Sequence, residues 1–218
     1  MLTYSQIKKN PQVLEFIEAT GRAAGEFSYT DHGLRHAQLV ADRARTIAIE
    51  IGLSKKEQEL AAIAGFCHDM GMFLGRSEHH YWGSLVFSQI FLGKIPTDDL
   101  VTVMQAIVNH DKEEIKILNK ISAVLILADK ADVHRSRVTE KDLEKIKTDI
   151  HDRVNYAVTE AKLRFENKEI ILKLKTDVKF VPLMEYFEIF TPRMAYCRSA
   201  AEHLGYKFGL EINNFKLL

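Results

Sequence analysis

The segment of residues 121–133, ISAVLILADKADV, constrains the fold more than any other part of this sequence. It is apolar almost throughout, which predicts a central helix that other elements bury on all sides. One carboxylate, Asp129, stands inside the run, with Leu125 and Ile126 one turn before it. An ionised carboxylate buried among apolar side chains costs several kcal/mol unless a cation compensates it. We therefore expect Asp129 to meet either a distant arginine or a metal ion.

The segments around this run also have helical periodicity. Apolar residues recur at three- and four-residue intervals, and Ser54 with Glu57 forms the pattern of a capping box at one helix start. Further helices are expected over about residues 11–22, 34–51, 54–68, 81–92, 97–109 and 139–167. This pattern predicts a mainly α protein with a helical domain over residues 1–166.

The last quarter of the chain has a different pattern. Apolar residues recur at every second position over residues 170–175 and again over residues 208–212, which is typical of half-buried strands. Between them, Thr191 and Pro192 resemble the first residues of a helix. We expect residues 167–218 to form a small strand–helix–strand appendage. It should pack on the helical domain, because no linker rich in proline or glycine separates the two.

The composition is that of a folded protein without a net charge. Apolar residues make up 46% of the chain, and 30 basic side chains balance 30 acidic ones. This balance does not favour binding to duplex DNA or to a membrane surface. Two cysteines, Cys67 and Cys197, suggest no disulfide framework, and we recognise neither a secretory leader nor a run of ~20 apolar residues. We expect a cytoplasmic protein.

Histidine and aspartate side chains stand at the ends of several predicted helices. The residues that could bind a metal ion are His36, His68, Asp69, His79, His110 and Asp129. Neutral imidazole and carboxylate groups together suit Fe, Mn, Ni, Co or Zn. Four imidazoles and two carboxylates exceed the needs of one tetrahedral site. We therefore expect two divalent metal ions bridged by one carboxylate, with the identity of the metal left open.

Each of these residues, taken singly, also has an ordinary structural explanation. A histidine at the C-terminal end of a helix interacts favourably with the helix dipole, which would account for His68 or His110. His80 competes with its neighbour His79 as a ligand. A salt bridge to a distant arginine would account for Asp129. The metal site is favoured because one centre explains the whole set at once.

The order of these residues resembles that of the HD superfamily of metal-dependent phosphohydrolases. The matching motifs are HGLRHAQLVADRA with His36, HDMG with His68 and Asp69, the H-x-x-x-G spacing of His79 and Gly83, AIVNHD with His110, and LADKAD with Asp129. The resemblance covers about residues 30–137. It implies an HD-type helical bundle, and hydrolysis of a phosphomonoester, phosphodiester or phosphoanhydride bond, commonly in a nucleotide. The core metal ligands that it implies are His36, His68, Asp69 and Asp129, with His79 and His110 as the additional pair of two-metal members.

Several branches of this superfamily carry motifs that this sequence lacks. No Gly-Tyr-Pro signature of the cyclic-dinucleotide phosphodiesterases follows His110, and the Glu-Asp pair of the alarmone hydrolases does not occur. The remaining resemblance is to the two-metal branch that includes dinucleoside-tetraphosphate hydrolases. Two other functions stay open. One is an oxygen-dependent di-iron enzyme of the same fold, and the other is a sensor or scaffold whose metal is structural.

Three cationic residues are expected to contact the phosphate of a small phosphorylated substrate. They are Lys130, which directly follows the proposed ligand Asp129 on the same buried helix; Arg76, on the loop before His79; and Arg35, directly before His36.

In the expected reaction, Asp69 and Lys130 act in catalysis. Two metal ions ~3.5–4 Å apart bridge and activate a water molecule, while Lys130 neutralises phosphate charge. His80 or Asp111 would supply a proton to the leaving group. An exposed strand edge in the appendage would allow two copies to pair as a homodimer.

Overall fold

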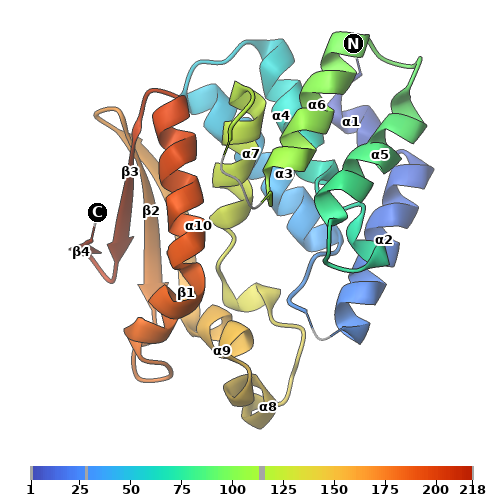
Figure 1. Cartoon of the computed structure of the whole chain (residues 1–218). Helices are drawn as coiled ribbons and strands as arrows, with labels where there is room; N and C mark the ends of the chain where they lie inside the picture. The colour runs from blue at the N-terminus through green and yellow to red at the C-terminus, as the bar shows by residue number, and fades with distance from the viewer. Residues whose placement is uncertain (1, 28, 113–115, 218) are drawn as a thin grey trace. The chain divides into compact units, whose positions relative to one another are not determined.

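The computed structural model describes residues 2–27, 29–112 and 116–217 of the chain, which is drawn in Figure 1. The chain forms two compact units, Met1–Asp129 and Lys130–Leu218. The division falls after Asp129, whereas the sequence pattern suggested a boundary near residue 166. Within the described ranges, no helix has both the length and the apolar character that a membrane span requires.

The first unit contains the helices that the sequence pattern predicts, together with a short N-terminal one. They are α1 (Tyr4–Ile7), α2 (Pro11–Glu26), α3 (Leu34–Glu50), α4 (Lys55–Cys67), the 3-10 helix η1 (Met72–Leu74), α5 (His79–Phe91), α6 (Thr97–Asn109) and α7 (Lys120–Lys130). Helix starts and ends agree with the expected ranges within a few residues. Ser54 caps α4 as predicted, because its hydroxyl oxygen accepts a hydrogen bond from the backbone N–H of Glu57 at 3.3 Å. Its own backbone N–H donates to Glu57 Oε2 at 2.8 Å, which completes the capping box.

α7 is buried along most of its length. From Ile121 to Ala128, no side chain is more than 3% exposed. This confirms the expected helix that is covered on all sides. Asp129 follows directly and is 7% exposed, so its carboxylate lies where it needs a compensating partner.

Small residues allow α3 and α4 to approach one another closely. A Cβ added at Gly65 of α4 would lie 2.8 Å from Cα of Ala41 on α3, so no larger side chain fits between these backbones. The contact brings the C-terminal end of α4, which leads into His68, beside the half of α3 that carries His36. A packing feature of the core therefore brings together two residues that the sequence analysis selected for their chemistry.

The second unit combines short helices with a mixed sheet. Its elements are η2 (Arg135–Arg137), α8 (Leu143–Thr148), α9 (Ile150–Ala157), β1 (Val158–Glu166), β2 (Glu169–Thr176), α10 (Leu183–His203), β3 (Lys207–Ile212) and β4 (Phe215–Lys216). The strands lie in the order β1-β2-β3-β4. β2 and β3 are parallel, and α10 connects them and packs on β3 (Figure 1). This part of the chain confirms the expected strand–helix–strand appendage.

The long helix expected over residues 139–167 is wrong in its second half. Residues 158–166 form β1, which pairs antiparallel with β2 so that Leu163 lies opposite Leu172. Asn167 and Lys168 connect the strands with positive φ angles of 49° and 61°. Two consecutive positive φ angles are typical of the tight hairpin turn that matches strand twist. The apolar spacing of this segment suited either structure, and pairing with β2 selected the strand.

The helix start expected at Thr191 and Pro192 is also wrong. α10 begins at Leu183, directly after Pro182, and Pro192 lies inside it. A proline inside a helix costs about 3 kcal/mol, because it removes an N–H donor and crowds the preceding turn. Burial of Tyr186 and Phe190 on the same helix, both 0% exposed, offsets that cost.

Candidate metal centre

Three histidines at helix ends are oriented by the same local contact. His68 follows α4, His110 follows α6 and His79 begins α5. In each ring, Nδ1 faces the backbone carbonyl oxygen three residues earlier, at 2.8 Å for His68, 2.9 Å for His79 and 2.6 Å for His110. A carbonyl oxygen only accepts hydrogen bonds, so Nδ1 carries the hydrogen. The lone pair on Nε2 of each ring then points away from its own backbone.

The Nε2 atoms of four histidines meet in two pairs. Nε2 of His36 lies 3.3 Å from Nε2 of His68, and Nε2 of His79 lies 3.2 Å from Nε2 of His110. Two lone pairs that face one another repel unless a proton or a cation lies between them. Each pair therefore has the form of two ligands directed at one cation.

The Asp69 carboxylate lies between the two pairs. Its Oδ2 is 3.5 Å from His36 Nε2 and 3.1 Å from His68 Nε2. Its Oδ1 is 3.4 Å from His79 Nε2 and 3.5 Å from His110 Nε2. One carboxylate oxygen thus faces each pair, which is the arrangement expected of a ligand shared by two metal ions.

Asp129 adds a second carboxylate to the first pair. Its Oδ1 lies 3.3 Å from His36 Nε2 and 3.7 Å from His68 Nε2. Ligand atoms within 4.8 Å of one another form three overlapping groups: His36, His68 and Asp69; His68, His110 and Asp129; and Asp69, His79 and His110. The structure therefore brings together all six residues that the sequence analysis selected as ligands.

The candidate metal centre is buried and carries strong local charge. Burial alone raises the pKa of Asp69, but the charge of His68 and hydrogen bonds from neighbouring histidines outweigh it and hold that pKa well below its usual range. Burial alone lowers the pKa of His68, whereas Asp69 and Asp129 more than reverse this and raise it to about 10. The negative potential that favours a proton on His68 equally favours a divalent cation.

The donor set fits divalent transition-metal ions. Oδ2 of Asp69 is buried and faces the Nε2 atoms of His68 and His36, at 3.1 and 3.5 Å. A buried carboxylate oxygen in that state is stabilised by a cation. Imidazole nitrogen and carboxylate oxygen are the donors that Fe, Mn, Co, Ni and Zn accept. The residues therefore fit the metals that the sequence analysis named.

A close contact between two glycines directs His79 into the centre. A Cβ added at Gly71 would lie 2.2 Å from the backbone nitrogen of Gly83 and 2.3 Å from the carbonyl oxygen of His79. His79 and Gly83 are one turn apart and share one face of α5. Because Gly83 packs against the turn that follows His68, His79 faces that turn too. This contact gives the H-x-x-x-G spacing its physical reason.

His80 lies outside the three groups of candidate ligands found among the described residues, whereas His79 belongs to one of them. Nε2 of His80 is 3.8 Å from Glu78 Oε2. Burial, together with the charges of His110 and His79, lowers the pKa of His80 to about 4. Oδ2 of Asp111, the other residue considered as a proton donor, lies 3.9 Å from His79 Nε2.

The three cations expected to bind phosphate lie in different surroundings. Arg35 donates from Nε to Asp31 Oδ2 at 2.5 Å. Arg76 has an exposed side chain, and its backbone carbonyl accepts one of the histidine hydrogen bonds described above. Lys130 belongs to the second unit, where its Nζ lies 6.0 Å from the centre of the Tyr196 ring. A role for these cations in substrate binding stays a prediction.

The sequence analysis missed the contacts that support the ligands. Thr20 on α2 is 1% exposed, and its hydroxyl donates to the backbone carbonyl of Asp69 at 3.1 Å. A threonine on the apolar side of a predicted helix gives no signal of such a role. The carbonyl acceptors belong to the backbone of Gly65, Arg76 and Ile107, so no side chain marks them in the sequence. They could have been found only by position, because each lies three residues before a histidine at a helix end.

The fold and the site together define the class: a helical protein with a buried His/Asp centre for divalent metals. A family model described as HD domain matches residues 33–157, which is more than half of the 218-residue chain and includes all six candidate ligands. The chain therefore belongs to the HD-domain family, as its motifs suggested, and to a superfamily of metal-dependent hydrolases. No curated protein matches the sequence.

Proposed function

We propose that this protein is a metal-dependent phosphohydrolase that cleaves a phosphomonoester, phosphodiester or phosphoanhydride bond, with a nucleotide as its substrate. The observation that carries the proposal is the position of Asp69, with one carboxylate oxygen toward each of two histidine pairs. Two bridged divalent ions are a general solution for displacement at phosphorus. Family membership supports the same chemistry, because HD-domain proteins are mostly metal-dependent phosphohydrolases.

The candidate ligands would divide between two ions. The residues that would hold the first ion are His36, His68 and Asp129; those for the second are His79 and His110, with Asp69 shared. When bound, the two ions supply Lewis acidity toward a phosphoryl oxygen and make water nucleophilic at neutral pH. The hydrogen bonds at Nδ1 keep the histidine lone pairs directed inward, and burial of the ligands excludes bulk water from them.

Cationic side chains would bind the substrate phosphate. Arg35 is oriented by Asp31, and a guanidinium held at Nε still presents its terminal N–H groups in a planar fork. Arg76 lies on the loop that leads into α5, and Lys130 follows Asp129 at the end of α7. In the proposed reaction, these cations offset the charge that develops on the phosphoryl oxygens, and Lys130 and Asp69 are the residues for which we propose a catalytic role.

The test begins with protein purified under nitrogen. Its metal content is measured, and phosphate release is then assayed on mononucleotides, cyclic nucleotides and dinucleoside polyphosphates with Mn, Co, Ni, Mg and Fe. We expect close to two ions per chain and hydrolysis of at least one nucleotide class. Asp69→Ala should lose metal and activity but keep its helical circular-dichroism spectrum, whereas the exposed Asp98→Ala should behave as the parent. Full activity of Asp69→Ala with added Mn would overturn the proposal.

The same experiment separates the two other functions. Turnover that requires both Fe and oxygen would identify an oxygen-dependent di-iron enzyme, because hydrolysis with Mn or Ni needs no oxidant. Tight metal binding without turnover of any compound would identify a sensor or scaffold with a structural site.

A further inference from the structure

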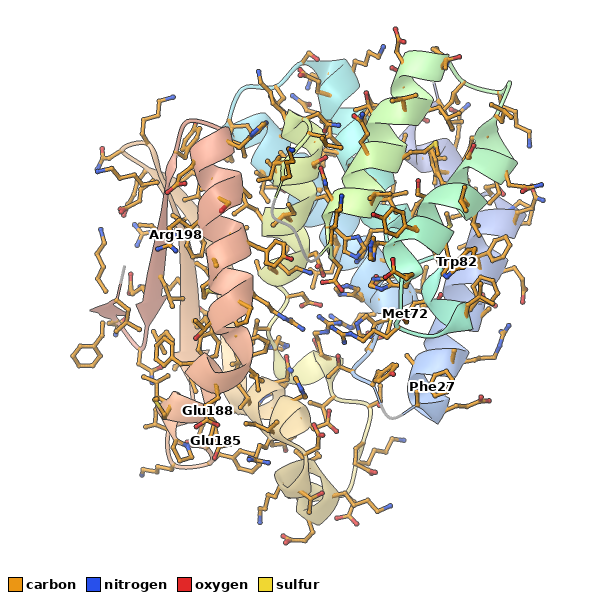
Figure 2. All side chains as sticks on the ribbon, viewed as in Figure 1. Phe27, Met72, Trp82, Glu185, Glu188 and Arg198 are labelled. Carbon is orange, nitrogen blue, oxygen red and sulfur yellow. The ribbon has the colours of Figure 1, made fainter. Side chains whose placement is uncertain are left out.

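One face of α5 is exposed, uncharged and rich in large apolar side chains. From His79 to Leu92, the sequence contains no Asp, Glu, Lys or Arg. The large apolar side chains exposed on this segment are Tyr81 at 40%, Trp82 at 45%, Leu85 at 55% and Leu92 at 68%; the uncharged Gln89 is exposed as well. The spacing of the four apolar residues places them along one side of the helix, opposite the buried Phe87, and Figure 2 shows Trp82 on α5. These four residues are called the α5 face below.

The α5 face is large enough to be an interface. Leu74 is 61% exposed on η1, which contacts α5, and we count it with the α5 face. Together the five side chains present on the order of 500 Å² per chain, near the upper end of what monomeric proteins expose as one patch. Tyrosine, tryptophan and leucine without charged neighbours are the composition of an interface centre. Two such faces in contact would bury about 1,000 Å², the lower limit for a specific association.

We propose that a second copy of this chain covers the α5 face, with the two α5 helices antiparallel about a twofold axis. In a twofold dimer the same surface of both copies meets, so any charged residue near the axis would face a like charge. The centre of the α5 face is uncharged, so two copies can meet there without this repulsion. Exposed charges flank that centre on both sides. Glu78 precedes the helix and Lys94 follows it, and each is eight residues from Val86.

The charges at the two ends select the antiparallel orientation. With the axis near Val86, Glu78 of one copy lies opposite Lys94 of the other, and this favourable pair occurs twice. A parallel arrangement would instead place like charges side by side. The contact lies wholly within the first unit and does not depend on the proposed catalytic activity.

The first test measures the oligomeric state of the full chain by sedimentation velocity over a range of concentrations. We expect reversible dimers for the parent protein and monomers for Leu85→Arg, because a buried, unpaired guanidinium disrupts an apolar interface. Leu143→Arg is the matched control, since Leu143 is 47% exposed on α8 and should leave the dimer intact. Circular dichroism and metal content confirm that each variant is folded. A parent protein that stays monomeric, or a Leu85→Arg protein that stays dimeric, would overturn the proposal.

The second test uses charge reversal to establish the orientation. Glu78→Lys should raise the dissociation constant of the dimer roughly 2- to 30-fold or more, because two rim pairs are lost at once. Adding Lys94→Glu should restore dimerisation, since the reversed charges again attract across the axis. Failure of this restoration would contradict the antiparallel contact. A monomeric parent that instead binds neutral phosphatidylcholine vesicles through Trp82 would show that the α5 face serves a membrane surface and would overturn the dimer.

Discussion

Substituting Gly71 by alanine tests whether the contact between Gly71 and Gly83 places His79 in the metal centre. The added methyl group would lie 2.2 Å from the backbone nitrogen of Gly83, 2.3 Å from the carbonyl oxygen of His79 and 2.8 Å from the carbonyl carbon of Trp82. All three neighbours are backbone atoms, so no change of side-chain rotamer relieves the overlap. The first turn of α5 must therefore move away from the turn that follows α4.

The size of the movement follows from ordinary contact distances. Non-bonded heavy atoms prefer separations of about 3.5–4.0 Å, so α5 has to shift by at least about 1 Å. Overpacking of this kind typically costs about 1–3 kcal/mol of stability. Because α5 carries His79, the shift pulls this ligand away from His110 and from Asp69. A misplacement of about 1 Å can lower activity about 100-fold.

We expect Gly71→Ala to lose the second metal ion selectively, since His36 and Asp129 do not lie on α5. Elemental analysis should fall from about two ions per chain toward one, with a lower melting temperature and weaker hydrolysis. Gly25→Ala is the matched control, because an added Cβ there meets nothing within 4 Å. Alanine is favoured over glycine inside a helix by about 1 kcal/mol, so this variant should be at least as stable as the parent. A Gly71→Ala protein with full metal content, stability and activity would refute the reasoning.

Three further predictions concern supporting contacts. Thr20→Val removes the donor to the Asp69 carbonyl and should cost about 1–3 kcal/mol and weaken metal binding; unchanged melting and metal titration curves would contradict this. Ser54→Ala should cost about 0.5–2 kcal/mol near neutral pH. The bond from the Ser54 hydroxyl to the Glu57 carboxylate lowers the pKa of Glu57, so this part of the stabilisation is present above the unfolded value of ~4.3 and is lost as the pH falls through the lower folded value. The cost of Ser54→Ala should therefore be smaller in acid than at neutral pH, and an equal cost at both would count against this. Burial raises the pKa of the Cys67 thiol, so a thiol reagent should label Cys67 only after unfolding, and rapid labelling of the native protein would disprove its burial.

Most of the secondary structure could be predicted from local sequence patterns. The capping box at Ser54 and the apolar run of α7 are determined by neighbours within one or two turns, so both could be predicted. β1 could not, because its apolar residues suit a helix as well as a strand and only the hairpin with β2 distinguishes the two. The helix start predicted at Pro192 was wrong for a related reason. Local rules place a proline at a helix start, but burial of the α10 side chains outweighs the cost of having Pro192 inside the helix.

The sequence alone determined the donor chemistry: which imidazoles and carboxylates the chain carries, and that they stand at helix ends around a buried segment. Only the tertiary structure decided how these groups meet. The close packing at Gly65 and Ala41 brings His36 to His68, and the contact of Gly71 with Gly83 admits His79 while leaving His80 outside. Whether one Asp69 oxygen faces each histidine pair depends on the relative position of four helices. A sequence pattern reports on residues within one or two helical turns, so it could not predict distances between segments far apart in the chain.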